Sequence, residues 1–392
     1  MNRRRNTRKR KNIMPGIDNR VFFSIIAIAL IIIIFCVFIL GKKNLKNKKN
    51  VAEFQKNANN EFEQFYNETN NEIGSLDNYQ TDKIIRISIV GDTVIDSKIE
   101  SVSSDYDSIF EDAKEQLKDA DIAIGTYSSD VKTDEDKKFA TSVHDSGIDL
   151  LNIATSSNND TEQFEQKDQN LKEIGFDTTG KYDENTENRV KIIEKRGEKI
   201  AIIAYNSQET SNVNYYDEEK ATEDLNYAKE NAKFTIVLMN WENKNDKVSK
   251  SQKKITDDLI SKGANVVVGT NSYCLQSFEM TQNENVQGFV ANSLGNYVSE
   301  STNEKSKLEL ILNLQIYIDK EGKSDIYKID YTPMYMYNSK TKEENTFKIF
   351  NMKQEISDYE EGKENIDETT YKKLTKGIDD IKKILGTTEQ VN

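Results

Sequence analysis

Histidine is almost missing from this chain, since His144 is the one copy among 392 residues. Histidine is the commonest side chain for binding transition metals and the readiest acid or base near neutral pH. One copy cannot build a two-metal hydrolytic centre of the usual His/Asp type, and a Ser-His-Asp triad would have to contain His144 itself. The scarcity of histidine therefore closes most hydrolytic chemistry to the chain.

Cysteine is also scarce, with copies only at Cys36 and Cys274. Cys36 lies inside a long apolar run, so the region after that run has a single thiol and cannot form an internal disulfide. The fold there must be held by its hydrophobic core, and the region is long enough to bury one. Cys274 has no predicted base beside it, so we expect a small buried thiol rather than a nucleophile.

The apolar run predicts a membrane anchor at residues 21–41. The stretch from Val21 to Leu40 carries no charge, and about twenty apolar residues in a helix span a bilayer core. The run continues into Gly41 and two lysines, not into the small residues of a signal-peptide cleavage site. Eight Lys and Arg residues precede the run and five soon follow it. This bias predicts a single-pass protein of the cell membrane, with a cytoplasmic N-terminus and an extracytoplasmic C-terminal domain.

Charge is distributed very unevenly along the sequence. Residues 1–50 hold thirteen Lys and Arg residues and one acid, whereas the whole chain has a net charge of −13. The part after residue 50 therefore carries −25. So acidic a domain is poorly suited to nucleic acid, because phosphate is bound by cationic groups, and we expect no nucleic-acid partner. The basic N-terminus instead suits the anionic inner leaflet of a membrane.

The order of predicted elements gives an α/β fold for the region after the anchor. Apolar strands alternate with helical segments from Lys83 onward, which is typical of layered α/β domains. Alternation over 308–318 and its partner 326–337 predicts two later antiparallel strands, with Pro333 at an edge or a bulge. We predict a cytoplasmic tail (1–20), the anchor (21–41), a polar helical stalk (42–82), an α/β domain (83–340) and a C-terminal extension with a terminal helix (341–392).

The loops after the predicted strands carry a family resemblance. They read Gly91-Asp92-Thr93, Gly125-Thr126-Tyr127-Ser128, Ala154 to Asp160, Asn240-Trp241-Glu242, Gly269 to Tyr273 and Asn292 to Tyr297. In this order they resemble the bacterial capsule-synthesis family, the CapA or poly-γ-glutamate synthesis (PGA_cap) group, over about residues 83–298. The resemblance implies a calcineurin-like metallophosphoesterase fold, a layered β-sandwich flanked by helices. It also implies a role in making, exporting or anchoring a capsule or poly-γ-glutamate-type polymer.

The chemistry of the site departs from that family. Every position where the family places a histidine holds a neutral polar residue here. Asn, Ser and Thr oxygens bind first-row metals far more weakly than imidazole, and a two-metal hydrolase needs both ions held firmly. The resemblance therefore implies a degenerate site with no expected cofactor. By the same resemblance, the residues that line this cleft are Ser157, Trp241, Thr270, Asn271 and Tyr273, with Asn240 and the acids Asp92 and Asp160 as the remaining ligand candidates.

Three hypotheses about function remain open from the sequence. The first is a non-catalytic accessory or scaffold protein whose partners are capsule or polyglutamate synthesis and export proteins. The second is a hydrolase with a rebuilt oxygen-ligand site for weakly bound Mg²⁺ or Ca²⁺, acting on a phosphoester or a polymer amide. Its ligands would be Asp92, Asp160, Asn240 and Glu242, of which Asp92 and Glu242 are the catalytic candidates.

The third hypothesis is a surface module that binds an anionic or sugar polymer. The emptied cleft would then use Trp241, Tyr127 and Tyr273 as aromatic walls. Plainer interpretations stand beside each candidate residue. Asp92 can cap the backbone that follows it, and Glu242 can be a solvated loop carboxylate. His144 falls in a predicted helix away from the site loops, which favours a surface or helix-capping histidine.

Overall fold

A computed structural model of the protein describes residues 84–95, 105–155, 160–241, 245–283, 286–301, 303–319, 321–340, 345–363 and 365–386. The predicted cytoplasmic tail, membrane anchor and stalk lie outside these residues. No helix in the described ranges is both long and apolar enough to cross a membrane.

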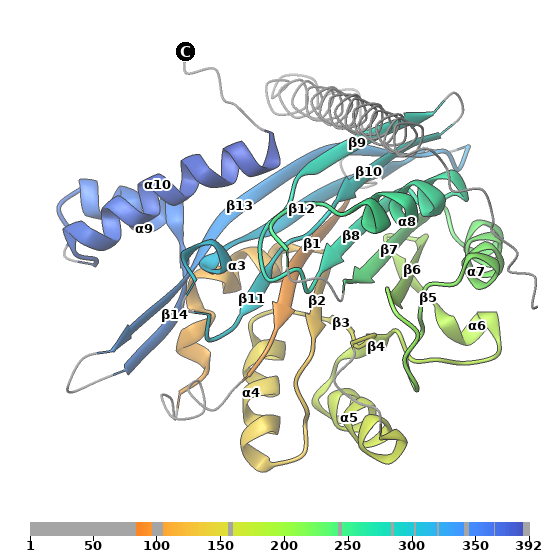
Figure 1. The fold of residues 1–392 in the computed structure, drawn as a ribbon, viewed down its shortest axis with the longest axis horizontal. Coiled ribbons are helices and arrows are strands. Elements are labelled where there is room, and N and C mark those ends of the chain that lie inside the picture. Colours follow the sequence, from red (N-terminus) through yellow and green to blue (C-terminus); the bar gives the residue numbers. More distant parts are fainter. Residues whose placement is uncertain are drawn as a thin grey trace, which may run out of the picture. The chain divides into compact units, whose positions relative to one another are not determined.

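The first sheet is mixed and is ordered β14-β13-β12-β1-β2-β3-β4, with the short strand β11 paired to the end of β1 (Figure 1). Strands β1 to β4 run parallel to one another, whereas β12, β13 and β14 join β1 as an antiparallel ladder. The strands are β1 (Ile84–Thr93), β2 (Ile122–Tyr127), β3 (Leu150–Asn152), β4 (Asp177–Thr179), β11 (Asn296–Val298), β12 (Leu308–Ile318), β13 (Ser324–Lys340) and β14 (Asn345–Asn351).

The second sheet is ordered β5-β6-β7-β8-β10-β9. Its central strands β6, β7, β8 and β10 are parallel, and an antiparallel strand lies at each edge. The strands are β5 (Val190–Lys195), β6 (Glu198–Asn206), β7 (Phe234–Asn240), β8 (Val266–Thr270), β9 (Phe278–Asn283) and β10 (Val286–Ala291).

The two sheets pack face to face, because side chains along β6 belong alternately to two different hydrophobic clusters. Ile200 and Ile202 belong to the large core that also holds Ile85 and Ile87 of the first sheet. Ile203, on the opposite face of β6, packs in a separate cluster with residues of the outer helices. Because successive side chains of a strand point to opposite faces, β6 is covered by a sheet on one side and by helices on the other. The predicted α/β fold with two sheets and flanking helices is confirmed.

Six of the eight described α-helices have a side-chain cap at the N-terminus. Thr133 and Ser249 each form a capping box with a residue three positions later, and Gly175 ends α5 at a positive φ of 127°. The helices are α3 (Glu111–Asp119), α4 (Asp134–Asp145), α5 (Thr161–Ile174), α6 (Thr186–Arg189), α7 (Glu218–Asn231), α8 (Lys250–Ser261), α9 (Met352–Glu360) and α10 (Glu368–Leu385), with short 3₁₀ turns at Asp107–Ile109 and Glu304–Lys307.

The Gly91-Asp92 segment is part of a strand, where the sequence predicted a loop after the strand. β1 continues through Asp92 and Thr93 because β2 and β11 both extend its ladder there. The glycine is needed for a close approach of two backbones, since a Cβ on Gly91 would lie 2.4 Å from the carbonyl oxygen of Gly295. Asp92 therefore projects from a strand, where its carboxylate accepts from the Ser128 hydroxyl.

The C-terminal elements belong to the first sheet. Pro333 pairs with Leu310 of β12 on one side, while β14 joins β13 only from Met334 onward. The predicted edge position of Pro333 is confirmed, because no strand among the described residues pairs with the other side of β13 there. The predicted domain boundary at residue 340 falls inside the hairpin that joins β13 to β14. The predicted terminal helix is α10, which covers Glu368–Leu385.

Glu309 of β12 is a buried carboxyl group whose two oxygens have no hydrogen-bond partner among the described residues. Burial raises the pKa of Glu309 well above its ordinary value of 4.5. The folded chain therefore keeps a proton that the unfolded chain releases, so stability is full below about pH 4.5 and falls as the pH rises from there toward the folded pKa.

We expect Glu309→Gln to remove this decline, because the amide does not titrate. Urea unfolding of the purified protein across this pH range should show the variant gaining on the wild type as the pH rises. Glu368→Gln, which changes an exposed carboxylate on α10, is the control and should run parallel to the wild type. Parallel curves for Glu309→Gln and the wild type would contradict the expectation.

Candidate functional site

Polar side chains from both sheets meet at the carboxyl ends of their parallel strands. Asp92, Thr126 and Asn152 stand at the ends of β1, β2 and β3 in the first sheet. Asn206, Asn240 and Thr270 stand at the ends of β6, β7 and β8 in the second. All six side chains are buried. Since α/β folds place their chemistry at this end of the strands, these residues define the candidate site.

Four neutral members of the site, Thr126, Asn152, Asn206 and Thr270, form hydrogen bonds, two of which cross between the sheets. Asn152 Nδ2 donates to Thr126 Oγ1 over 3.3 Å, and Thr126 Oγ1 lies 3.3 Å from Thr270 Oγ1. Asn206 Nδ2 of the second sheet donates to the Ala154 carbonyl oxygen over 3.3 Å. The Asn152 side-chain oxygen accepts from the Ala154 N–H at 2.8 Å. The Thr126–Thr270 and Asn206–Ala154 contacts join the two sheets. All of these hydrogen bonds use donor and acceptor atoms that a ligand would need.

Asp92 is the carboxylate of the site, and it is already engaged. The Ser128 hydroxyl lies 2.7 Å and 2.8 Å from its two oxygens. The backbone positions this contact, because Ser128 N–H donates to the Thr93 carbonyl oxygen. Ser128 therefore supplies a hydroxyl donor to the Asp92 carboxylate.

A buried lysine supplies positive charge beside this carboxylate. Lys167 of α5 is 2% exposed, and its Nζ donates to the Tyr127 carbonyl oxygen over 2.9 Å. Burial lowers the pKa of Lys167 to about 8, while the charges of Asp130 and Asp92 act in the opposite direction. The sequence did not single out Lys167, because it sits among other charged residues of a helix and nothing local marks it as buried.

Trp241 closes the site instead of lining an open cleft. Its ring is 1% exposed, and Nε1 donates to the Asn292 carbonyl oxygen over 2.7 Å. The indole lies against the backbone of Gly269, where an added Cβ would come within 2.0 Å of Nε1. Tyr127 is fully buried as well. Two of the three aromatic walls expected for polymer binding are therefore covered by protein.

The loop after β8 holds two non-glycine residues in the left-handed region. Asn271 and Tyr273 both have a φ of 61°, and Ser272 between them is buried. Such a conformation costs on the order of 1 kcal/mol or more for a side chain such as tyrosine. Asn271 and Tyr273 are two of the residues that the family resemblance places in the cleft, so this part of the cleft is built on an unusual backbone. Cys274 is buried, with Sγ 3.4 Å from Ser306 Oγ.

The other predicted site residues lie apart or outside the described ranges. Asp160 is exposed, and its carboxylate accepts from the Gln163 N–H over 3.0 Å as the N-cap of α5. Ser157 and Glu242 are outside the described residues. His144 ends α4 away from the site, and its ring packs edge-on against Phe176 with a centroid distance of 5.1 Å.

The donor set does not fit a two-metal centre. In the described ranges no three His, Cys, Asp or Glu side chains are grouped closely enough to hold a metal ion. At the carboxyl ends of the described strands, Asp92 is accompanied by neutral amides and hydroxyls, and those of Thr126, Asn152, Asn206 and Thr270 bond to protein atoms. Neutral oxygens of this kind hold first-row transition metals weakly. The described residues therefore supply no pair of firmly held ions.

Comparisons with solved structures found distant likenesses. A hypothetical protein from Thermus thermophilus is 11% identical, with a TM-score of 0.44 over 64% of this chain and 98% of that one. A novel phosphatase from Mycoplasma pneumoniae is 12% identical, with a TM-score of 0.43 over 64% and 94%. Vps29 from Chaetomium thermophilum is 8% identical, with a TM-score of 0.25 over 64% and 96%. At these scores the likenesses carry no information about activity.

The comparison with curated proteins found no match. The family comparison did, because residues 86–301 match the family described as bacterial capsule synthesis protein PGA_cap. The matched range covers more than half of the chain, and it runs from β1 to just beyond β11. It contains every strand end that contributes to the candidate site. The chain therefore belongs to the bacterial capsule synthesis family PGA_cap, as a divergent member that lacks the family's metal-binding histidines.

Proposed function

We propose that this protein is a membrane-anchored, extracytoplasmic and non-catalytic member of its family. It acts as an accessory or scaffold in the biosynthesis, export or anchoring of a capsule or poly-γ-glutamate-type polymer. Its partners are the proteins that make or export that polymer. Family membership supports the link to capsule synthesis, and the uncharged segment at residues 21–41 supports the anchor.

The non-catalytic role is supported by the burial and the hydrogen bonds of the side chains at the strand ends. Thr126, Asn152 and Thr270 are buried and bonded to one another, and Asp92 receives the hydroxyl of Ser128. Catalysis by two metals requires open coordination positions next to a substrate. A closed, mutually hydrogen-bonded layer supports a role in holding the sandwich together.

Metal content of the purified full chain tests the proposal. After exposure to Mn²⁺, Fe²⁺ or Zn²⁺ and removal of free ions, we expect far less than one ion per chain by elemental analysis. Asp92→Asn should leave that figure unchanged. Near-stoichiometric metal that is lost in Asp92→Asn would sink the proposal, and the same result with Mg²⁺ or Ca²⁺ would favour the rebuilt hydrolase.

Polymer yield in cells provides the second measurement. Deleting the gene should lower the amount of surface polymer, and Asp92→Asn should restore it as well as the wild type does. Asp119→Asn, at an exposed position on α3, is the matched control for expression. Failure of Asp92→Asn alone, with normal protein levels, would show that the carboxylate has a chemical role.

A further inference from the structure

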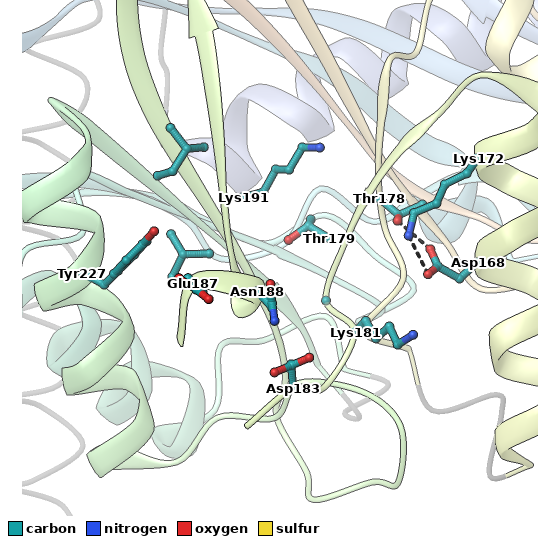
Figure 2. Close-up of a pocket in the computed structure, with 13 residues that line it drawn as sticks. Asp168, Lys172, Thr178, Thr179, Lys181, Asp183, Glu187, Asn188, Lys191 and Tyr227 are labelled. Carbon is teal, nitrogen blue, oxygen red and sulfur yellow. Dashed lines mark hydrogen bonds and ion pairs between the residues drawn. The ribbon is translucent and has the colours of Figure 1, made fainter. Parts of the chain in front are cut away.

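A pocket of about 530 Å³ lies between the edge strands of the two sheets, away from the strand ends described above (Figure 2). β4 ends the first sheet and β5 ends the second, and residues 180–189 carry the chain from one to the other. The volume falls in the usual range for small-molecule sites, roughly 300–1,000 Å³. None of the hypotheses drawn from the sequence involved this place.

A buried ion pair fixes the segment that lines the pocket. Arg189, at the end of α6, donates through Nε to Asp224 of α7 over 2.9 Å. Its Nη1 donates to the carbonyl oxygens of Asp183 and Glu184, both over 2.9 Å. One buried guanidinium thus fixes the crossing segment to α7. A site fixed in advance loses less conformational entropy when a ligand binds.

The three lysines that line the pocket are already paired with carboxylates. Lys172 binds Asp168 over 2.8 Å, and Lys181 binds Glu165 over 2.6 Å. Lys191 is paired with Asp177 in the same way. Figure 2 shows the first of these pairs together with the Thr178 hydroxyl, which donates to Asp168. An anionic ligand would have to break these pairs, so the lining favours a neutral ligand.

Other groups that line the pocket are suited to a ligand that carries hydroxyl groups and an apolar ring face. Thr179 is buried, and its Oγ1 has no hydrogen-bond partner among the described residues. Hydrogen bonds from the Asn185 N–H and from Asn188 lower the pKa of Asp183, which keeps that carboxylate an acceptor. Tyr227 stands on the opposite side from Asp168, on α7 (Figure 2), where it packs beside the second core. A tyrosine ring offers a flat apolar face with a polar tip.

We propose that this pocket binds a neutral, hydroxyl-rich saccharide segment. Its hydroxyls both donate and accept, which matches the Thr179 hydroxyl and the Asp183 carboxylate, and its C–H face matches the Tyr227 ring. The identification of that saccharide as part of the surface polymer rests on the proposed function. The pocket itself and its preference for a saccharide do not depend on that function.

Binding to the full chain, purified in a detergent without a sugar head group, tests the proposal. The probes are an array of short neutral oligosaccharides of glucose, galactose, mannose and N-acetylglucosamine, with a poly-γ-glutamate oligomer beside them. We expect at least one neutral oligosaccharide to bind. Thr179→Val and Tyr227→Ala should each weaken binding about tenfold or more. Asp183→Asn, at a half-buried loop position, provides a third variant that leaves the core intact.

Matched controls are Thr222→Val on the exposed face of α7 and Tyr371→Ala on α10, which should bind as the wild type does. Absence of binding to every neutral oligosaccharide overturns the proposal, as does binding that survives all three pocket variants. Salt-sensitive binding of poly-γ-glutamate alone overturns it in favour of an anionic ligand. If sugar binding fails while gene deletion still lowers polymer yield, the pocket proposal fails and the proposed function stands.

Discussion

Gly269→Ala should prevent the two-sheet domain from folding stably. A Cβ at this position would lie 2.0 Å from Trp241 Nε1 and 2.1 Å from the Asn292 carbonyl oxygen. Neither atom has room to withdraw, because the indole is buried and hydrogen-bonded to that same carbonyl. Overpacking a core by one methyl group costs about 1–3 kcal/mol, and a clash with backbone lies at or above the top of that range.

Gly125→Ala is the matched control, because it adds the same methyl group to a buried strand of the other sheet. Its Cβ would meet the nearest neighbours, Ile148, Leu151 and Val90, only at 3.4 Å, which is close to ordinary van der Waals contact. The free energy of unfolding of both variants, measured with urea, gives the comparison. Equal stability for Gly269→Ala and Gly125→Ala would show that Trp241 does not press on Gly269.

Asp224→Asn should cost up to about 3–5 kcal/mol, because it removes the buried partner of the Arg189 charge and leaves only the exposed Glu223 carboxylate, 3.3 Å from Nη2. Both side chains are almost fully covered, and Arg189 Nη2 lies 2.7 Å from Asp224 Oδ1. Asp224 also accepts from the Tyr205 hydroxyl over 2.8 Å, so the substitution disturbs a three-residue network. Chemical unfolding of the purified protein measures the loss.

Asp119→Asn supplies the control for that substitution. It breaks an ion pair with Arg86 of similar length, 2.8 Å, in which both side chains are exposed. Exposed pairs contribute about 0–1 kcal/mol, so this variant should unfold almost as the wild type does. Replacing both partners, as in Arg189→Met with Asp224→Leu, should recover part of the loss, because no buried charge remains. Comparable losses in Asp224→Asn and Asp119→Asn would contradict our account of the network.

The sequence predicted best those elements whose apolar pattern is long and regular. The predicted strand at 308–318 has the bounds of β12, and the predicted terminal helix is α10. Helix α7 was missed, because its buried face consists of Ala221, Leu225 and Ala228 together with a charged residue. The partner that makes Asp224 a buried residue lies 35 positions away along the chain, and no local pattern shows it.

The candidate site, too, was predicted from the sequence only in part. The family resemblance predicted that Asn240, Thr270 and Tyr273 belong to the site. The structure brings Thr270 into contact with Thr126 across the sheets. The burial of Lys167 and of Trp241 depends on how α5 and the loop after β7 pack, which is tertiary information. The pocket between β4 and β5 also escaped the sequence, since it exists only where the edges of two sheets come together.

The order of strands in the first sheet sets a constraint on how the chain reaches its native state. β1 is the first described strand to be synthesised, yet its antiparallel partner β12 follows more than 200 residues later. Until β12 has been synthesised, the edge of β1 that pairs with it has no strand partner. The apolar side chains Ile85, Ile87 and Ile89 then lack the neighbours that β12 provides. Sheets that close through such distant pairings form slowly and expose strand edges that aggregate. The segment that matches the family ends at residue 301, before β12 begins, so expressed alone it would lack the strand that closes its own sheet.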